Sequence, residues 1–378
     1  MFSNKMIAGI LIPVVLEQLL NSIMGTADTM MVSNIGSAAI SAVSLVDSIN
    51  ILVIQAFSAL AAGGAIVCSQ NKKMANESAR QVLFIITAIS IAVSVLCLGF
   101  KKPLLRLIFG SVEADVMRAS ETYFFYTAIS FPFIAAYDSA ASIFRAQENT
   151  KGPMLISMIS NAMNIVGNAI MIWIFHMGVA GAAISTLVSR IFCAVVVLIQ
   201  LRKDRQPIVV RAYLKIRPDW AMIRRILGIG IPSGVENSMF QLGKIAVLSL
   251  VSGLGTASLA ANAVSNNIAN FAILPGMSFG FALLTVCAQC VGAGDFEQVK
   301  YYTKHMMRVE YLCLIASNLL VILSLPFILS IYNLSDEAAM YTNDIILYHA
   351  ACVVTIWPLS FTLPNTLRAA ADVKVTMI

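Results

Sequence analysis

Residues 6–32 of the chain read MIAGILIPVVLEQLLNSIMGTADTMMV, an apolar stretch whose features return in the second half of the sequence. A bilayer crossing takes about 20 predominantly apolar residues, so this stretch is long enough to span a membrane as a helix. Its residues and those of the next segment recur at a constant spacing, with Gly9, Ile12, Pro13, Glu17, Ala42, Cys68 and Gln70 matched by Gly228, Ile231, Pro232, Glu236, Ala261, Cys287 and Gln289. Self-similarity at a fixed spacing indicates an internal repeat. The chain is therefore predicted to hold two copies of one arrangement of membrane helices.

The composition of the whole chain agrees with a membrane environment. Of its 378 residues 59% are hydrophobic and 12% are charged, whereas about 25% are charged in a typical soluble domain. A soluble globule has too little interior to bury so much apolar surface. The composition excludes a soluble enzyme, a nucleic-acid binder and a disordered chain, and it predicts an all-α polytopic membrane protein.

Polar, Gly and Pro residues divide the chain into ten apolar stretches. These are 6–32, 38–69, 79–100, 119–144, 153–175, 180–201, 221–251, 257–289, 309–331 and 345–367. Residues 202–219 form the only long polar connection, so we predict an N-lobe over 1–201 with six helices, a cytoplasmic linker over 202–219, and a C-lobe over 220–378 with four. Six crossings separate the copies, so the repeats are parallel, as in transporters whose two halves handle substrate between them.

The positive charges predict the orientation. With the N-terminus in the cytoplasm, most Lys and Arg residues fall on the cytoplasmic side, including the cluster at 202–225. The net charge of +6 is then a topology signal and not a nucleic-acid site. The seven Cys residues lie mostly in apolar runs and are expected to be free hydrophobic side chains. Cys287 and Cys290 form a CxxC without a second ligand pair, so no metal cluster is predicted.

Polar residues within the apolar stretches are the functional candidates, because an ionisable group inside a bilayer costs at least a few kcal/mol. Glu17, Asn21 and Asp28 share one face of the first predicted helix. Asp28 is the strongest candidate for function. Glu17 and Glu236 are equivalent in the repeat, which favours a shared structural role.

A second polar stripe lies on the fifth predicted helix, where Asn161, Asn164 and Asn168 share one face. Such carboxamides either bond neighbouring helices or offer carbonyl oxygens to a cation. On the next helix Thr186 and Arg190 share a face, and for Arg190 a structural ion pair is favoured over a role as counter-charge.

The remaining charged candidates are weaker. Lys244 follows Glu236 by eight residues and is a candidate partner for it, with a structural role favoured. Asp47 and Asp138 lie nearer the ends of their predicted spans. The sequence holds no nucleophile–base pair or phosphate loop, so neither an enzyme nor a cofactor is predicted.

These residues resemble the multidrug and toxin extrusion (MATE) family of cation-coupled exporters over the whole length. The markers of the resemblance are Pro13 with Asp28-Thr29, the Gly36 turn, Ser69-Gln70, the inner loop Arg145-Ala-Gln-Glu-Asn-Thr-Lys151 and the helix start Gly178-Val-Ala-Gly-Ala-Ala-Ile-Ser-Thr186.

The resemblance implies two six-helix lobes and a cation site in the N-lobe. Carried over by position, the cation-coupling residues are Asp28, Asn164 and Thr186, with Asn168 beside them, and Pro13 is the proline at which the first helix bends. Asn168 departs from the pattern, because many members carry a second carboxylate there. Pro358 likewise stands where some members have a C-lobe carboxylate. The last two helices of the second lobe are expected to be missing.

We therefore expect a secondary antiporter that exports cationic or amphipathic small molecules in exchange for H⁺ or Na⁺ by alternating access. It is expected to act as a monomer in the cytoplasmic membrane, with no metal beyond Na⁺ at the coupling site and no nucleic-acid partner. Two alternatives stay open: a lipid or lipid-linked-sugar flippase of the same superfamily, and a non-transporting remnant.

Overall fold

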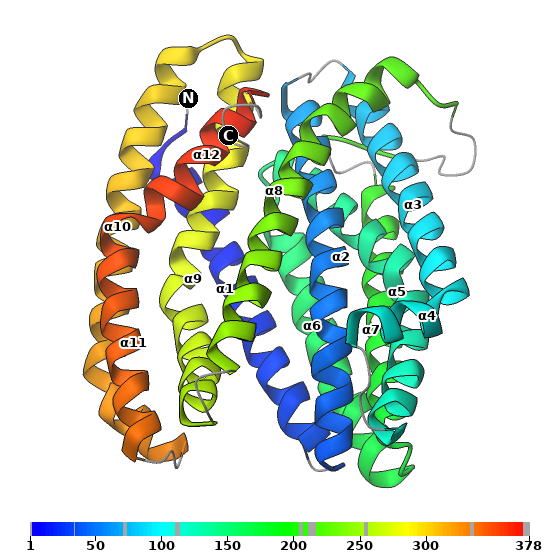
Figure 1. The fold of residues 1–378 in the computed structure, drawn as a ribbon. Coiled ribbons are helices and arrows are strands. Elements are labelled where there is room, and N and C mark those ends of the chain that lie inside the picture. Colours follow the sequence, from blue (N-terminus) through cyan, green and yellow to red (C-terminus); the bar gives the residue numbers. More distant parts are fainter. Residues whose placement is uncertain are drawn as a thin grey trace. The chain divides into compact units, whose positions relative to one another are not determined.

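A computed structural model describes residues 2–33, 35–70, 74–109, 114–203, 207–210, 217–252, 256–332 and 336–372. Within these ranges the regular structure is entirely helical (Figure 1). The α-helices are α1 (Asn4–Ser33), α2 (Ser37–Gln70), α3 (Ala75–Gly99), α4 (Lys101–Phe109), α5 (Ala114–Ala146), α6 (Lys151–Ala169), α7 (Gly178–Leu201), α8 (Trp220–Ser252), α9 (Thr256–Gly292), α10 (Phe296–Tyr332), α11 (Asp336–Thr355) and α12 (Leu363–Ala369). Two π-helical segments are η2 (Ile170–Ile174) and η3 (Pro358–Thr362). The predicted all-α class is confirmed.

The helices pack into two compact units. Unit 1 comprises Met1–Leu19 and Ser238–Ile378, and unit 2 comprises Leu20–Asn237. The boundaries of the units therefore fall inside α1 and α8, although α7 ends and α8 begins at the two ends of the predicted linker.

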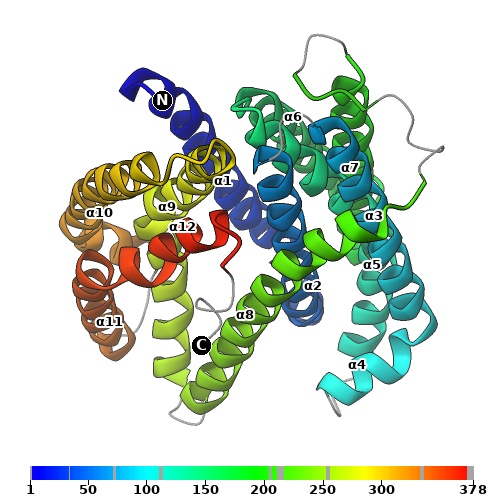
Figure 2. The same ribbon diagram turned by 90° about the horizontal axis from the view of Figure 1, so that it is seen from above.

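In unit 2, α5 is the central helix and contacts α2, α3 and α7. Figure 2 shows these three helices gathered around it. Its buried side chains include many Ala and Ser residues, and such small side chains let helix backbones approach closely inside a membrane. The Ser142 hydroxyl donates to the Ala61 carbonyl of α2 at 3.0 Å, and the Ser94 hydroxyl of α3 donates to the Ala128 carbonyl at 2.7 Å.

In unit 1, α9 packs against α10, α11 and α12. One apolar cluster joins α9, α10 and α11 and consists of Val264, Ile268, Ala272, Val321, Leu325 and Ile346. The chain bends by 57° between α11 and the segment made of η3 and α12. Pro358 begins η3 and lacks the backbone N–H that would continue the helix, which accounts for a break at this point.

Seven of the described helices contain a stretch long and apolar enough to cross a membrane, and the bent pair in unit 1 would make an eighth span. The sequence predicted ten. The two predicted spans that fall short lie in α5 and α8. In α5, Ser, Thr and Tyr residues and Pro132 lower the mean hydropathy. In α8, Pro, Gly and polar residues dilute the apolar content.

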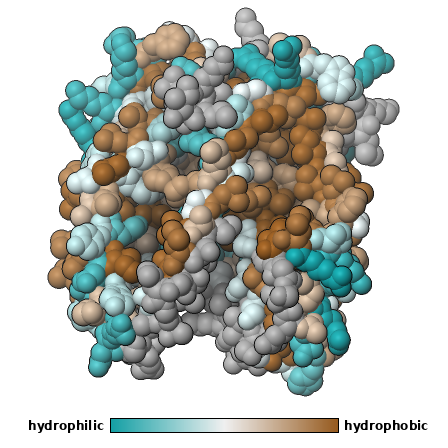
Figure 3. All heavy atoms as spheres, in the orientation of Figure 1, coloured by the Kyte–Doolittle hydropathy of each residue, from teal (hydrophilic) through white to brown (hydrophobic). Residues whose placement is uncertain are grey.

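Apolar side chains also cover outward faces of the helices. On α10, Leu320, Leu323 and Phe327 are 68%, 74% and 70% exposed. Figure 3 shows apolar residues along the middle of the helices on one face, with hydrophilic residues mostly toward the helix ends. Such exposed apolar surface fits contact with lipid. The seven cysteines are all free, as predicted.

The described parts of the predicted linker are bound to helices of unit 2. The Ile208 and Val209 amides donate to the side-chain oxygens of Gln147 and Asn76 at 3.0 and 2.9 Å. Residues 204–206 and 211–216 of the linker lie outside the described residues.

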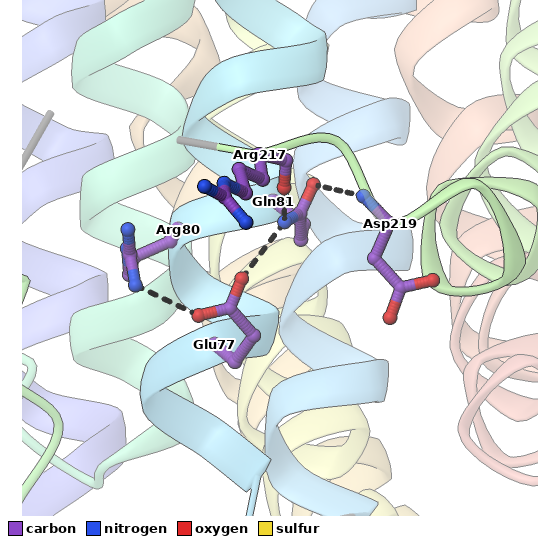
Figure 4. A network of polar contacts seen from close by, with 5 residues as sticks. All are labelled: Glu77, Arg80, Gln81, Arg217 and Asp219. Atoms are coloured by element: carbon purple, nitrogen blue, oxygen red, sulfur yellow. Dashed lines mark hydrogen bonds and ion pairs between the residues drawn. The ribbon is translucent and has the colours of Figure 1, made fainter. Parts of the chain in front are cut away.

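Gln81 of α3 joins the end of the linker to the bundle (Figure 4). Its buried amide nitrogen donates to Glu77 Oε1 at 2.8 Å and to the Arg217 carbonyl at 2.7 Å, and its oxygen accepts from the Asp219 amide at 3.2 Å. The Asp219 carboxylate in turn accepts from the Ala221 and Met222 amides at 3.0 and 3.2 Å, which caps the start of α8.

We expect Gln81→Leu to lower the free energy of unfolding by about 1–3 kcal/mol, because it leaves buried polar partners unsatisfied. Thermal unfolding in detergent and limited proteolysis within the linker measure the effect. Lys300→Met is the control, because it removes an exposed ion pair of 2.9 Å with Glu297 that contributes little to stability. Equal unfolding midpoints and equal cleavage for Gln81→Leu and the parent would contradict the assignment.

Candidate functional site

Two polar stripes, one on α1 and one on α6, meet in unit 2. Asn21 Oδ1 accepts from Ser157 Oγ and from Asn161 Nδ2, both at 3.0 Å. Two helical turns further along α1, Asp28 Oδ1 accepts from Asn168 Nδ2 at 2.6 Å. Stripes predicted separately on two helices are therefore complementary faces of one contact, because residues spaced by three, four or seven positions lie along one side of a helix.

The asparagines continue the contact from Asp28 to α7. Asn168 Nδ2 also donates to Asn164 Oδ1 at 3.3 Å, and Asn164 Nδ2 donates to Thr186 Oγ1 at 3.2 Å. The Thr186 hydroxyl donates to the Ala182 carbonyl of its own helix at 3.0 Å. The four predicted cation-coupling residues, Asp28, Asn164, Asn168 and Thr186, thus form one chain of hydrogen bonds across α1, α6 and α7.

One oxygen of this chain lacks a partner. Asn168 is 1% exposed, both of its amide hydrogens are directed to acceptors, and its Oδ1 is buried without a hydrogen-bond partner among the described residues. A buried, unsatisfied acceptor costs about 1–3 kcal/mol. The free oxygen lies on the residue that contacts the Asp28 carboxylate, so a cation or a proton donor bound here would satisfy it.

The local backbone supports close packing at this point. α6 ends at Ala169, directly after Asn168, and continues as η2. π-helical segments are rare and occur frequently at functional sites. Gly167, the residue before Asn168, faces Ser185 of α7, and a β-carbon at this glycine would clash with the serine hydroxyl. The Ser185 hydroxyl donates to the Asn164 carbonyl at 2.9 Å, which fixes α7 against the stripe.

Further charged groups lie near Asp28. Asp47 of α2 accepts from Asn50 Nδ2 at 3.1 Å. Arg190 lies within electrostatic range of Asp28, Asp47 and Asp138. The three carboxylates of Asp28, Asp47 and Asp138 therefore all lie near the Arg190 side chain.

The hydrogen bond of Arg190 goes to Ser130 Oγ at 2.7 Å and not to a carboxylate. The structural ion pair favoured from the sequence is therefore not formed within the described residues. The role of Arg190 as a counter-charge stays a prediction.

The other predicted residues lie apart from this chain of bonds. Pro13 and Glu17 are buried in the part of α1 that belongs to unit 1. Glu236 is half-buried in α8. Lys244 is exposed over the Phe240 ring, with its Nζ 5.9 Å from the ring centroid. The suggested pairing of Lys244 with Glu236 stays a prediction.

Sequence reasoning undervalued or missed three sets of residues. Asp47 was placed near a span end, although it lies ten residues inside α2. Ser157 and Ser185 were overlooked, and only the helical spacing of Ser157 to Asn161 could have indicated a role. Glu310 was missed because the apolar stretch was started at residue 309, whereas α10 begins at Phe296.

The sequence matches a known protein family in both halves of the chain. The model of the family described as MatE matches residues 13–170 and again 232–378. The two matched segments begin at Pro13 and Pro232, the prolines that the internal repeat aligns.

Two relatives come from Bacillus subtilis (strain 168). "Probable multidrug resistance protein YoeA" is 26% identical over 364 residues, which cover 92% of this chain and 76% of the relative. "Uncharacterized transporter YisQ" is 26% identical over 378 residues, which cover 96% of this chain and 81% of the relative.

A solved structure shares the fold. It is described as the outward-facing conformation of a multidrug resistance MATE family transporter of the MOP superfamily. The TM-score is 0.90 at 18% sequence identity, and the match covers 99% of this chain and 84% of the other.

Proposed function

The chain belongs to the MatE family of transporters, and from this premise we propose that it is a secondary antiporter that exports cationic or amphipathic small molecules in exchange for H⁺ or Na⁺. As an integral membrane protein of this family it is a multidrug-type transporter. The location in the cytoplasmic membrane, the cytoplasmic N-terminus and the monomeric state are parts of the proposal.

The observation that carries the proposal is the bond from Asn168 Nδ2 to Asp28 Oδ1, with Asn168 Oδ1 buried and unsatisfied beside it. Carboxylate and amide oxygens are the ligands that hard cations prefer. The nearby carboxylate of Asp47 further favours uptake of a positive charge beside Asp28.

The proposed mechanism is alternating access with cation binding at Asp28. A bound cation shifts an equilibrium between two states only as far as its affinity for them differs. Asp28, Asn164 and Thr186 come from three helices, α1, α6 and α7. A movement of α1 against the other two would therefore break the bond between Asp28 and Asn168 and change the affinity for the cation.

The test is efflux of a cationic fluorescent dye from proteoliposomes, with H⁺ and Na⁺ gradients imposed separately. Efflux driven by one gradient and absent without it is the expected result and identifies the coupling ion. Absence of efflux under both gradients would contradict the antiporter. A labelled-lipid translocation assay on the same vesicles would then show whether the chain is a flippase.

We expect Asn168→Asp to strengthen the dependence of transport on Na⁺. The new carboxylate would stand where an amide now contacts Asp28 at 2.6 Å, and repulsion between two such charges is relieved by a bound cation. About 1.4 kcal/mol of added attraction corresponds to an about tenfold lower half-saturating Na⁺ concentration. Transport rates over a Na⁺ series at fixed pH provide the measurement.

The matched control is Asn161→Asp, on the same stripe of α6 but bonded to Asn21 and not to a carboxylate. An unchanged Na⁺ response in Asn168→Asp, or the same increase in Asn161→Asp, would count against Asn168 as a ligand.

A further inference from the structure

Unit 1 contains a buried carboxylate of its own. Glu310 lies in the interior of α10, fourteen residues from its start, and is 0% exposed. Its Oε1 accepts a hydrogen bond from the Thr362 hydroxyl at 2.6 Å. Its Oε2 is buried without a hydrogen-bond partner among the described residues. Oε1 of this carboxyl group therefore has a hydrogen-bond partner, whereas Oε2 has none among the described residues.

No described group neutralises this carboxylate by an ion pair. The titratable side chains within electrostatic range are Tyr311 and Cys313 of the same helix. The helices packed against α10 offer Cys287 and Cys290 on α9, Asp336, Glu337, Tyr341, Asp344, Tyr348, His349 and Cys352 on α11, and Arg368 on α12. None of these forms an ion pair with Glu310 in the described part of the chain. An ionised carboxylate here would be buried and unpaired, which costs several kcal/mol.

The ligand that fits this group is a proton. Two carboxylate oxygens and one hydroxyl are too few for a hard metal cation, since Ca²⁺ collects six or more oxygens. The single hydrogen of the Thr362 hydroxyl is already directed to Oε1. A proton on Oε2 would neutralise the carboxyl group without a further ligand.

Thr362, whose hydroxyl contacts Glu310, belongs to η3, and the chain bends between α11 and η3. Thr362 is the last residue of η3, just beyond the 57° bend after α11. Hinges are element-terminal residues that absorb backbone changes, and π-helical segments are frequent at functional sites. A change in this bend would move Thr362 relative to Glu310 and would remove the one hydrogen bond that stabilises its charged form.

From these observations we propose that Glu310 is a proton-exchange site of unit 1, separate from the Asp28 site, and that Thr362 positions its carboxyl group. Glu310 takes up a proton at Oε2 from water when a movement of η3 withdraws the Thr362 hydroxyl, and it returns that proton to water when the hydrogen bond to Oε1 forms again. The transport part of this proposal rests on the proposed antiport, whereas the exchange of a proton at Glu310 does not.

The direct test is infrared difference spectroscopy of the purified full-length protein between acid and alkaline pH. A carboxyl group that titrates contributes a C=O band of its protonated form, and we expect Glu310→Gln to remove one such band. The control is Glu297→Gln, an exposed carboxylate on the same helix, which should leave the buried band in place. An identical difference spectrum in Glu310→Gln and the parent would overturn the proposal.

Thr362→Val provides a second variant that keeps Glu310 itself. It removes the hydrogen bond to the carboxyl oxygen, so the C=O band should shift to higher frequency. Thr366→Val is the matched control, because its hydroxyl lies 3.1 Å from Thr303 Oγ1. A band that stays unshifted in Thr362→Val would contradict the positioning role.

A transport assay provides the third test of the proposal. We expect proteoliposomes with Glu310→Gln to lose one coupled proton per cycle, read from the shift in the pH gradient at which dye flux reverses. Dye antiport by the parent without a titrating band would refute the Glu310 proposal and leave the antiporter intact. A titrating band in a protein that transports no dye would support the Glu310 site and refute the antiporter.

Discussion

Asp28→Asn is expected to abolish cation-driven export while the protein still inserts and folds. The substitution keeps the oxygen that accepts from Asn168 Nδ2, so the contact between α1 and α6 at 2.6 Å is retained in shape. It removes the negative charge, and the attraction between two unit charges about 4 Å apart is about 4 kcal/mol at an effective dielectric constant of about 20. The corresponding loss in cation affinity is about a hundredfold or more.

Efflux of a cationic dye from proteoliposomes under a fixed H⁺ or Na⁺ gradient measures the effect, with size-exclusion chromatography as the check on folding. Asp115→Asn is the matched control, because it makes the same chemical change in an exposed side chain at the start of α5. Persistence of both pH- and Na⁺-dependent efflux in Asp28→Asn would rule out Asp28 as the coupling residue.

Helical periodicity predicted the two polar stripes, and the family resemblance predicted that Asp28, Asn164 and Thr186 belong to one site. Asn161, Asn164 and Asn168 were placed on one face of a helix because their spacing is three and four, and Asn21 and Asp28 because theirs is seven. The role of each residue in coupling stays a prediction, but the structure brings Asp28, Asn164, Asn168 and Thr186 together by hydrogen bonds.

The pairing between helices could not be obtained from the sequence. The spacing does not predict that Asn161 contacts Asn21 and that Asn168 contacts Asp28. The register between the two stripes depends on how α1 and α6 pack. The same limit applies to Arg190, whose neighbours come from several helices.

Hydropathy likewise had a physical limit. All ten predicted apolar stretches lie in helices, but seven or eight of them reach the length and hydropathy typical of a span, because polar and small residues lower the hydropathy of α5 and α8. Glu310 was not predicted as a buried carboxylate for a related reason. A charge that begins an apolar run reads as the edge of a membrane helix, whereas α10 continues for fourteen residues before it.

The second large effect is expected at the contact between α2 and α8 in unit 2. Gly63 and Gly230 face each other so closely that a β-carbon on Gly63 would lie 2.8 Å from the Gly230 nitrogen. A β-carbon on Gly230 would lie 2.8 Å from Leu60 Cα. Both obstacles are backbone atoms, which cannot move aside as a side chain can. Small residues at such positions allow membrane helices to pack closely.

We therefore expect Gly230→Ala to lower the free energy of unfolding by about 1–3 kcal/mol through overpacking. Gly228→Ala, two residues earlier in α8, should act in the opposite direction. Nothing lies within 4 Å of a β-carbon at Gly228, and alanine is favoured over glycine in a helix by about 0.5–1 kcal/mol.

Thermal unfolding in detergent can be followed by labelling of the buried cysteines, since the thiols of Cys68, Cys193, Cys287 and Cys290 are buried in the folded protein. The midpoint should fall for Gly230→Ala and rise slightly for Gly228→Ala. One substitution at two positions of one helix removes differences in side-chain chemistry and helix propensity from the comparison. Equal midpoints for the two variants would show that α2 and α8 are not in backbone contact, and the close packing of Gly63 against Gly230 would then be wrong.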